Sequence, residues 1–187
     1  LFEESIQAKV EALPLLEQPI VEAAELIVSQ LLNGAKLLSC GNGSSAADAQ
    51  YFAALMQHRF ERERPGLPAL ALNSDAAILT AIAIDEGYSA IFAKQVGALG
   101  HPGDVLLVFS ISGSAVNTIA AVEYRIDGRS WLITRFHCEM PAVSTKITSW
   151  ARMSKRSARI NATNWYVIWK NTTVWNALIL RRAVNIC

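Results

Sequence analysis

The sequence predicts an α/β protein in which a parallel sheet is covered by helices on both faces. Mainly apolar stretches at residues 36–40, 68–72 and 104–109 alternate with segments of helical periodicity. Strands that are apolar throughout are typical of parallel sheets buried on both sides. Serine-rich loops follow the first and third stretches, at the carboxyl ends of strands where such sheets bind ligands.

Helices are expected before and between these strands. Residues 1–33 predict two helices broken at Pro14, and Gly34 is placed to cap the second. A charged, solvated turn is expected over residues 61–66. Further helices are predicted over the alanine-rich residues 45–60, over residues 75–84 and 88–98, and from about Ser114 onward.

The character of the chain changes after residue 123. All five tryptophans lie beyond residue 130. Residues 131–134 are interpreted as a fourth strand and residues 160–180 as a closing helix, although asparagine and β-branched residues disfavour that helix. The chain is predicted to be one domain over residues 1–187, with leading helices at 1–34 and an α/β core at 35–187.

The composition is that of an ordinary globular protein. The chain has 187 residues, of which 52% are hydrophobic and 18% charged, with a net charge of +1. This near-neutral charge argues against a nucleic-acid surface, and no apolar run is long enough for a membrane span. The acidic start lacks a signal-peptide layout, so a cytoplasmic location is expected. The three cysteines show neither metal-binding spacing nor a disulfide framework.

Two serine-rich loops carry the main functional signal. The first is Ser39-Cys40-Gly41-Asn42-Gly43-Ser44-Ser45 and the second is Ser110-Ile111-Ser112-Gly113-Ser114. Glycine lets a backbone approach a ligand closely, while free N–H groups and the dipole of the following helix favour negative charge. Two such loops at one sheet edge predict a phosphorylated small molecule held from two sides.

Other interpretations of the first loop remain open. Gly41-x-Gly43-x-x-Ala46 is close to a dinucleotide fingerprint, which also needs an acidic residue ending the next strand. Glu61 and Glu63 lie at the required distance along the chain, but no strand is predicted before them. A purely structural turn is the other interpretation, and the second serine loop argues against it. Cys40 is interpreted as a small buried residue and not as a nucleophile.

Four separated motifs resemble the sugar isomerase (SIS) domain family, in the branch of bacterial phosphoheptose isomerase and the DnaA initiator-associating protein DiaA. The resemblance covers residues 1–120, and the motifs occur in order. Beyond residue 123 the tail is either divergent or carries a sequence error such as a frame shift. The motifs occupy residues 40–50, 59–65, 103–107 and 110–113, and in the tail only residues 157–160 resemble the family.

The resemblance implies a three-layer αβα sandwich of flavodoxin-like topology and a homotetramer that packs through helices. It also implies a site for sedoheptulose 7-phosphate, or a similar phosphorylated sugar, between subunits. The residues that it places against this ligand are Asn42, Gly43, Ser44, Ser45 and Asp85 along the sugar, with Ser110 and Ser112 at the phosphate.

The acid, base and metal ligands of phosphoheptose isomerase are missing at the corresponding positions. The resemblance implies a glutamate and a histidine for proton transfer, and zinc held by two histidines, that glutamate and a glutamine. Those four positions hold Tyr51, Leu55, Asn161 and Trp169. Asp85 and Glu86 remain as weak catalytic candidates. No metal site or cofactor is therefore predicted, and zinc is expected only for an active isomerase.

Two functions of different classes follow from this pattern. The first is a non-catalytic phosphosugar-binding tetramer similar to DiaA, which binds a partner such as the replication initiator DnaA. The second is a phosphoheptose isomerase that converts sedoheptulose 7-phosphate to D-glycero-D-manno-heptose 7-phosphate for lipopolysaccharide synthesis. Tyr51 and Leu55 lie in the well-matched half of the chain, where a frame shift in the tail has no effect, and they favour the first function. A phosphosugar sensor is a third, less favoured possibility.

Overall fold

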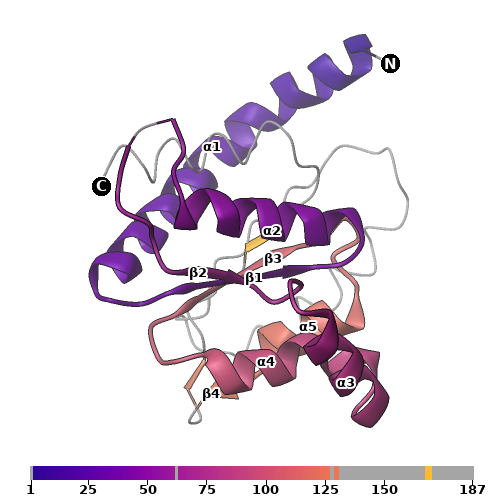
Figure 1. Ribbon diagram of the computed structural model, residues 1–187. Helices are drawn as coiled ribbons and strands as arrows, with labels where there is room; N and C mark the ends of the chain where they lie inside the picture. Colours follow the sequence, from indigo (N-terminus) through magenta and orange to yellow (C-terminus); the bar gives the residue numbers. More distant parts are fainter. Residues whose placement is uncertain (1, 62, 127–128, 131–166, 170–187) are drawn as a thin grey trace.

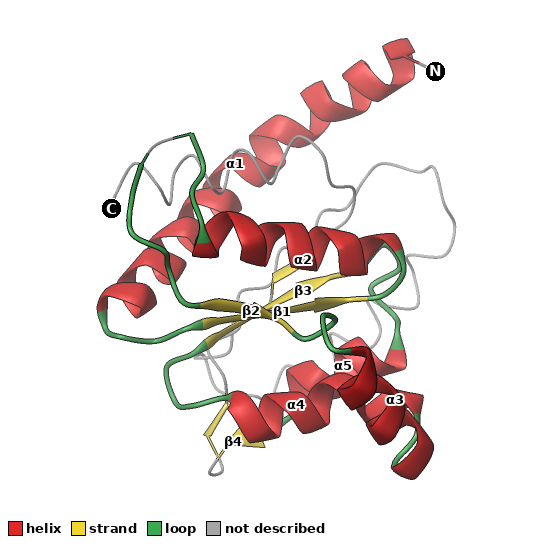
Figure 2. Cartoon of the chain, in the orientation of Figure 1, coloured by secondary structure: helices red, strands yellow, loops and turns green. Residues whose placement is uncertain are grey.

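One parallel sheet lies between two layers of helices in the computed structural model (Figures 1 and 2). The structure describes residues 2–61, 63–126, 129–130 and 167–169. The strand order is β2-β1-β3-β6, and each of these pairings is parallel. The predicted α/β class is thus confirmed. The strands are β1 (Leu37–Gly41), β2 (Ala69–Ala71), β3 (Val105–Phe109) and β6 (Val167–Trp169).

The helices divide between the two faces of the sheet, as Figure 2 shows. One layer consists of α1 (Phe2–Leu32) and α2 (Ser44–Gln57). The other consists of α3 (Ala76–Asp85), the 3₁₀ turn η1 (Tyr88–Ala90), α4 (Ile91–Leu99) and α5 (Val116–Glu123).

All residues of β1 and β3 are buried, which explains why both strands are mainly apolar. Ser39 is the polar exception in β1, and its buried hydroxyl donates to Ala49 O at 2.9 Å. Successive side chains of a strand point to opposite faces, so each strand contributes to two cores. Leu37 and Leu107 pack in the core beneath α1 and α2, where the rings of Phe52 and Phe109 are 6.0 Å apart. The alternate strand residues Leu38, Leu106 and Val108 point to the opposite core, where they pack with Phe92 and Val96 of α4.

The predicted break at Pro14 is wrong, because α1 is continuous and contains both Pro14 and Pro19. A proline inside a helix costs about 3 kcal/mol. Ala12 and Leu16 lie on either side of Pro14 and pack against the same core, and this burial offsets the cost. Gly34 caps the helix as predicted, with a φ of +82° and a hydrogen bond from Ala35 N–H to Gln30 O of 3.0 Å.

The structure changes several other boundaries. Helix α2 ends at Gln57 instead of residue 60, and the helix predicted over 88–98 divides into η1 and α4. Residues 167–169, predicted as helix, form β6, because their β-branched and aromatic residues suit a strand beside β3. A short antiparallel pair joins β4 (Arg125–Ile126) to β5 (Arg129–Ser130). The strand predicted at 131–134 and the rest of the 160–180 helix lie outside the described residues.

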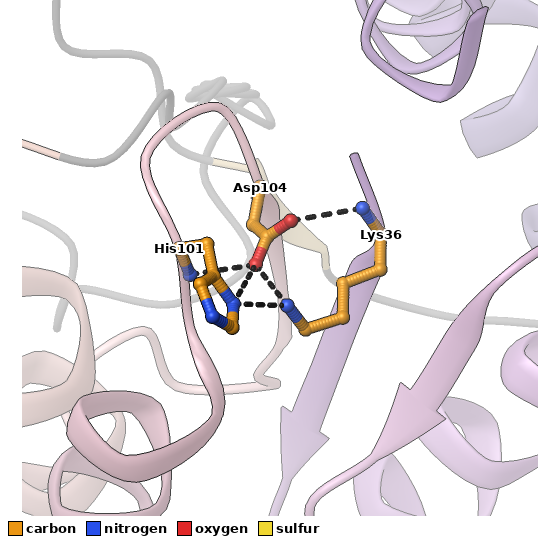
Figure 3. A network of polar contacts seen from close by, with 3 residues as sticks. All are labelled: Lys36, His101 and Asp104. Carbon is orange, nitrogen blue, oxygen red and sulfur yellow. Dashed lines mark hydrogen bonds and ion pairs between the residues drawn. The ribbon is translucent and has the colours of Figure 1, made fainter. Parts of the chain in front are cut away.

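A polar network ties β1 to β3 at their amino ends (Figure 3). Asp104 precedes β3 and is almost fully buried. Its carboxylate accepts hydrogen bonds from Lys36 N–H at 2.9 Å, Lys36 Nζ at 2.5 Å and His101 N–H at 2.7 Å. This network lies at the opposite end of the strands from the serine loops. Within the described residues, no helix has both the length and the apolarity to cross a bilayer.

Candidate functional site

The first serine loop turns directly from β1 into α2. Gly41 ends the strand in a crowded place, where a Cβ atom would meet Ser45 O at 2.5 Å and Phe109 O at 2.8 Å. Gly43 precedes α2 with a φ of +57° and open space around it. No side chain caps the helix. Ser44 is exposed at its first turn, whereas Ser45 is buried.

The second serine loop joins β3 to α5 and is held by its own hydroxyls. Ser110 is buried, and its Oγ accepts a hydrogen bond from Gly113 N–H at 2.9 Å. Ser112 is exposed, and its Oγ accepts from Ser114 N–H at 3.2 Å. A hydroxyl that accepts still has a hydrogen to donate. Neither hydroxyl hydrogen has an acceptor among the described residues.

The two loops begin side by side. Gly41 pairs with Phe109 in the parallel register of β1 and β3, so Asn42 and Ser110 follow equivalent positions on neighbouring strands. The side-chain amides of Asn42 and Asn117 exchange two hydrogen bonds of 2.8 Å each. Asn117 lies in the first turn of α5. This amide pair therefore connects the first loop to the helix that follows the second.

Three asparagine and tyrosine side chains at this edge were not among the predicted site residues. Asn117 is one, and Tyr88 is another, since its hydroxyl lies 3.2 Å from Asn42 Oδ1. The third is Asn73, which follows β2 and donates from Nδ2 to Gly41 O at 2.6 Å. Its buried Oδ1 has no hydrogen-bond partner within the described part of the chain. The position of Asn73 after a predicted strand was a usable signal, whereas no sequence pattern joins Tyr88 or Asn117 to Asn42.

Asp85 and Glu86, the carboxylates predicted near the sugar, lie at the end of α3, in the helix layer on the opposite face of the sheet from α2. Asp85 is exposed at the end of α3, and none of the described hydrogen bonds joins its side chain to either loop. Glu86 forms an ion pair of 2.6 Å with Lys94 on α4. The hydrogen bond from Lys94 to Glu86, with the attraction between their charges, raises the pKa of the Lys94 ammonium. Glu86 is thus engaged away from the loops.

The residues at the implied zinc positions do not fit that metal. Tyr51 is 56% exposed on α2, and Leu55 packs against the apolar core one turn later. The described residues contain no group of three His, Cys, Asp or Glu side chains that would hold a metal ion. Trp169, matched to a position in the last helix, lies instead in β6 opposite Phe109, and Asn161 is outside the described residues.

Cys40 is fully buried, as the sequence predicted. Burial raises the pKa of its thiol far above the ordinary value, because the interior disfavours the thiolate. A protonated thiol without access to solvent is a poor nucleophile. Cys40 therefore belongs to the core on the α3–α5 side of the sheet and not to the chemistry of the site.

The fold and the site define a class: an α/β protein with two uncharged, donor-bearing loops at the carboxyl edge of a parallel sheet. Uncharged donors and backbone amides of this kind suit an anion or a polar small molecule. The SIS domain family model matches residues 1–127. The chain belongs to the SIS domain family, in the branch of phosphoheptose isomerase and DiaA.

Relatives with two different names are about equally similar in sequence. A phosphoheptose isomerase from Alteromonas mediterranea is 56% identical over 122 residues. A DnaA initiator-associating protein DiaA from Klebsiella pneumoniae is 57% identical over the same number of residues. Each alignment covers 65% of this chain and 62% of the relative, so the chain matches less than two thirds of the length of either protein.

Solved structures match over a longer region. Phosphoheptose isomerase GmhA from Neisseria gonorrhoeae has a TM-score of 0.71 at 35% identity, covering 99% of this chain and 93% of the other. A phosphoheptose isomerase from Francisella tularensis has a TM-score of 0.73 at 36% identity, with the same coverage. These similarities confirm the SIS-like α/β fold.

Proposed function

We propose that this chain is a non-catalytic phosphosugar-binding protein similar to DiaA, which assembles as a cytoplasmic homotetramer and binds a protein partner such as DnaA. One observation carries the proposal. Tyr51 and Leu55 occupy the positions that the resemblance assigns to a metal-binding histidine and a catalytic glutamate. An aldose–ketose isomerase needs a positioned acid and base, and a tyrosine that is half exposed beside a leucine packed in the core provides no such pair.

The two serine loops support the proposal that the chain binds a phosphosugar without isomerising it. Ser110 and Ser112 each keep a hydroxyl hydrogen to donate, and the amides of the loop at Gly43 lie at the start of α2. These groups suit the phosphate of sedoheptulose 7-phosphate or of a similar sugar. Asn42, Ser44 and Ser45 follow in the first loop and are proposed to lie along the sugar.

The proposed tetramer is supported by the leading helix. The amino-terminal half of α1 extends beyond the α/β layers (Figure 1). Ile6, Val10 and Leu13 recur there at helical spacing and are 60%, 60% and 50% exposed. We assign this α1 stripe to contact with other copies of the chain, because burial of three large apolar side chains favours association.

The isomerase remains the second candidate, since one set of observations favours it. The relative from Alteromonas mediterranea and both solved structures carry the name phosphoheptose isomerase. Asp85 and Glu86 are the carboxylates that remain as weak candidates for the base in this function. Resequencing of the coding DNA after residue 120 tests this alternative cheaply, because a glutamine and a histidine recovered in the last helix would favour it.

The deciding experiment combines binding with turnover. The purified protein is mixed with sedoheptulose 7-phosphate, with and without zinc, and heptose 7-phosphate isomers are followed by ³¹P and ¹H NMR while calorimetry measures binding. We expect binding without turnover. Formation of D-glycero-D-manno-heptose 7-phosphate would overturn the non-catalytic proposal, and absence of binding would overturn the phosphosugar site.

The partner is tested separately by pull-down of purified DnaA. The variant Ile6→Glu/Val10→Lys/Leu13→Glu is a control for the need for assembly. Capture of DnaA by the unchanged chain is the expected result. Failure of DnaA to bind would remove the DiaA-like role and leave phosphosugar sensing.

A further inference from the structure

The orientations of the Asn42 and Asn117 amides are determined by one backbone group. The N–H of Thr118 donates to Asn117 Oδ1 at 2.9 Å, and a backbone N–H has no other role than donor. The atom that it contacts is therefore the amide oxygen of Asn117. Since Asn42 lies against both ends of that amide, its Nδ2 donates to Asn117 Oδ1 and its Oδ1 accepts from Asn117 Nδ2.

Tyr88 completes the arrangement. With Asn42 Oδ1 established as an acceptor, the hydroxyl of Tyr88 is the donor in the contact of 3.2 Å between them. An amide oxygen has two lone pairs and an amide nitrogen two hydrogens. Both lone pairs of Asn42 Oδ1 are used, by Asn117 and by Tyr88. The Asn42 side chain therefore keeps one Nδ2 hydrogen that it can donate to a ligand, and it has no lone pair left to accept with.

We infer that Asn117 and Tyr88 are positioning residues, which hold the Asn42 amide so that it offers the ligand one N–H donor and no acceptor. The inference rests on the proposed function, because it deepens the role of the same ligand site. The ligand atom opposite Asn42 is consequently an acceptor, such as a phosphate oxygen or the carbonyl oxygen of an open-chain sugar. A sugar hydroxyl binds there through its oxygen and not through its hydrogen.

The burial of the residues supports this division of roles. Asn117 is 3% exposed, and its amide is already engaged, because Oδ1 accepts from Asn42 Nδ2 and Thr118 N–H while Nδ2 donates to Asn42 Oδ1. Asn42 is half-buried at the edge of the sheet, next to the open space around Gly43. Tyr88 is 63% exposed, so the loss of its hydroxyl removes the hydrogen bond to Asn42 without leaving a cavity in the core.

The test separates positioning from stability with two variants and a control. Tyr88→Phe removes one hydroxyl, and Asn117→Ala removes the amide partner. Tyr124→Phe is the control, since it also deletes the hydroxyl of a tyrosine that is 39% exposed, and Tyr124 makes none of the described hydrogen bonds to Asn42. Sedoheptulose 7-phosphate is the probe. Calorimetry gives Kd, urea unfolding gives stability, and ¹⁵N NMR follows the side-chain amide hydrogens of Asn42.

We expect Tyr88→Phe to raise Kd about 3-fold and Asn117→Ala about 10-fold, because loss of a hydrogen bond that orients a donor weakens binding modestly. The urea midpoint of Tyr88→Phe stays that of the unchanged chain. In the unchanged chain one Asn42 N–H is protected from exchange before ligand is added and the second becomes protected afterwards. Tyr124→Phe changes neither Kd nor the NMR signals.

The outcomes distinguish the two proposals. If the unchanged chain binds the sugar phosphate but both variants bind within 2-fold of it, the positioning role is wrong and the phosphosugar site stands. If the unchanged chain does not bind, both proposals fall. Should Asn117→Ala fail to fold, Tyr88→Phe still decides, since an unchanged Kd and an unchanged Asn42 spectrum in that variant would overturn the inference.

Discussion

Asn42 and Asn117 face each other through two hydrogen bonds of 2.8 Å, although 75 residues separate them in the chain. Asn42 follows β1 and Asn117 lies in α5, so the pair joins the loop after β1 to the helix that follows β3. Asn117 is buried, so this connection lies within the fold. The candidate site is thus one unit and not two independent turns.

Gly41 and Gly43 are expected to respond differently to alanine. At Gly41 a Cβ atom meets the backbone oxygens of Ser45 in α2 and Phe109 in β3 at 2.5 and 2.8 Å, so the backbone of the helix or the strand must shift. We expect Gly41→Ala to lower the free energy of unfolding by about 2–3 kcal/mol. At Gly43 an added Cβ atom meets open space, so we expect Gly43→Ala to lower the free energy of unfolding by about 1 kcal/mol, from the positive φ alone. Urea unfolding of both variants measures the difference, and equal effects would contradict the crowding at Gly41.

Asp104 is expected to be the most sensitive charged residue of the described chain. Asp104→Ala leaves two backbone N–H groups and the Lys36 ammonium without their carboxylate, and we expect a loss of about 2–4 kcal/mol in the free energy of unfolding. Glu86→Ala removes an exposed ion pair with Lys94 and is the matched control. A similar urea midpoint for both variants would show that the network of Figure 3 contributes little.

Cys40 is expected to make stability depend on pH in the alkaline range. Its thiol pKa is raised in the folded state, so the folded protein keeps a proton that the unfolded chain loses above its ordinary pKa of about 8.5. The stabilisation is complete below that pH and is lost above it, with a slope of about 1.4 kcal/mol per pH unit.

Urea titrations from pH 7 to 10 measure this slope in a Cys138→Ser/Cys187→Ser background, which leaves Cys40 as the sole thiol. Cys40→Ala in the same background is the control and lacks the dependence. In that background, a thiol-specific reagent labels Cys40 at neutral pH only after denaturation. Rapid labelling of the folded chain would show that the thiol is not buried.

The α1 stripe is expected to control assembly. Charged residues at Ile6, Val10 and Leu13 remove the apolar surface that we assign to other copies of the chain, and light scattering after size exclusion is expected to show a smaller species. Gln7→Ala/Glu11→Ala is the control, because it removes an exposed hydrogen bond of 2.8 Å on the same helix. An unchanged mass in the stripe variant would place the assembly surface elsewhere.

Much of the fold was predictable because burial leaves a direct pattern in the sequence. The apolar stretches became β1, β2 and β3, with the parallel pairing that their burial predicts. The continuous α1 was not predictable, since the packing of Ala12 and Leu16 that outweighs Pro14 is not visible in local sequence. Strand β6 was missed for a related reason: a partner strand far away in the chain decided its conformation.

By itself the sequence determined the parallel sheet, its two serine loops and the presence of Tyr51 and Leu55 where the resemblance implies a histidine and a glutamate, because these depend on residue type and local order. Only the tertiary structure decided which polar groups meet at the site. Asn73 reaches Gly41, and Tyr88 and Asn117 reach Asn42, because parallel strands bring distant loops to one edge. Hydrogen bonds between such loops depend on the packing of whole helices against the sheet, and a linear sequence carries no pattern for them.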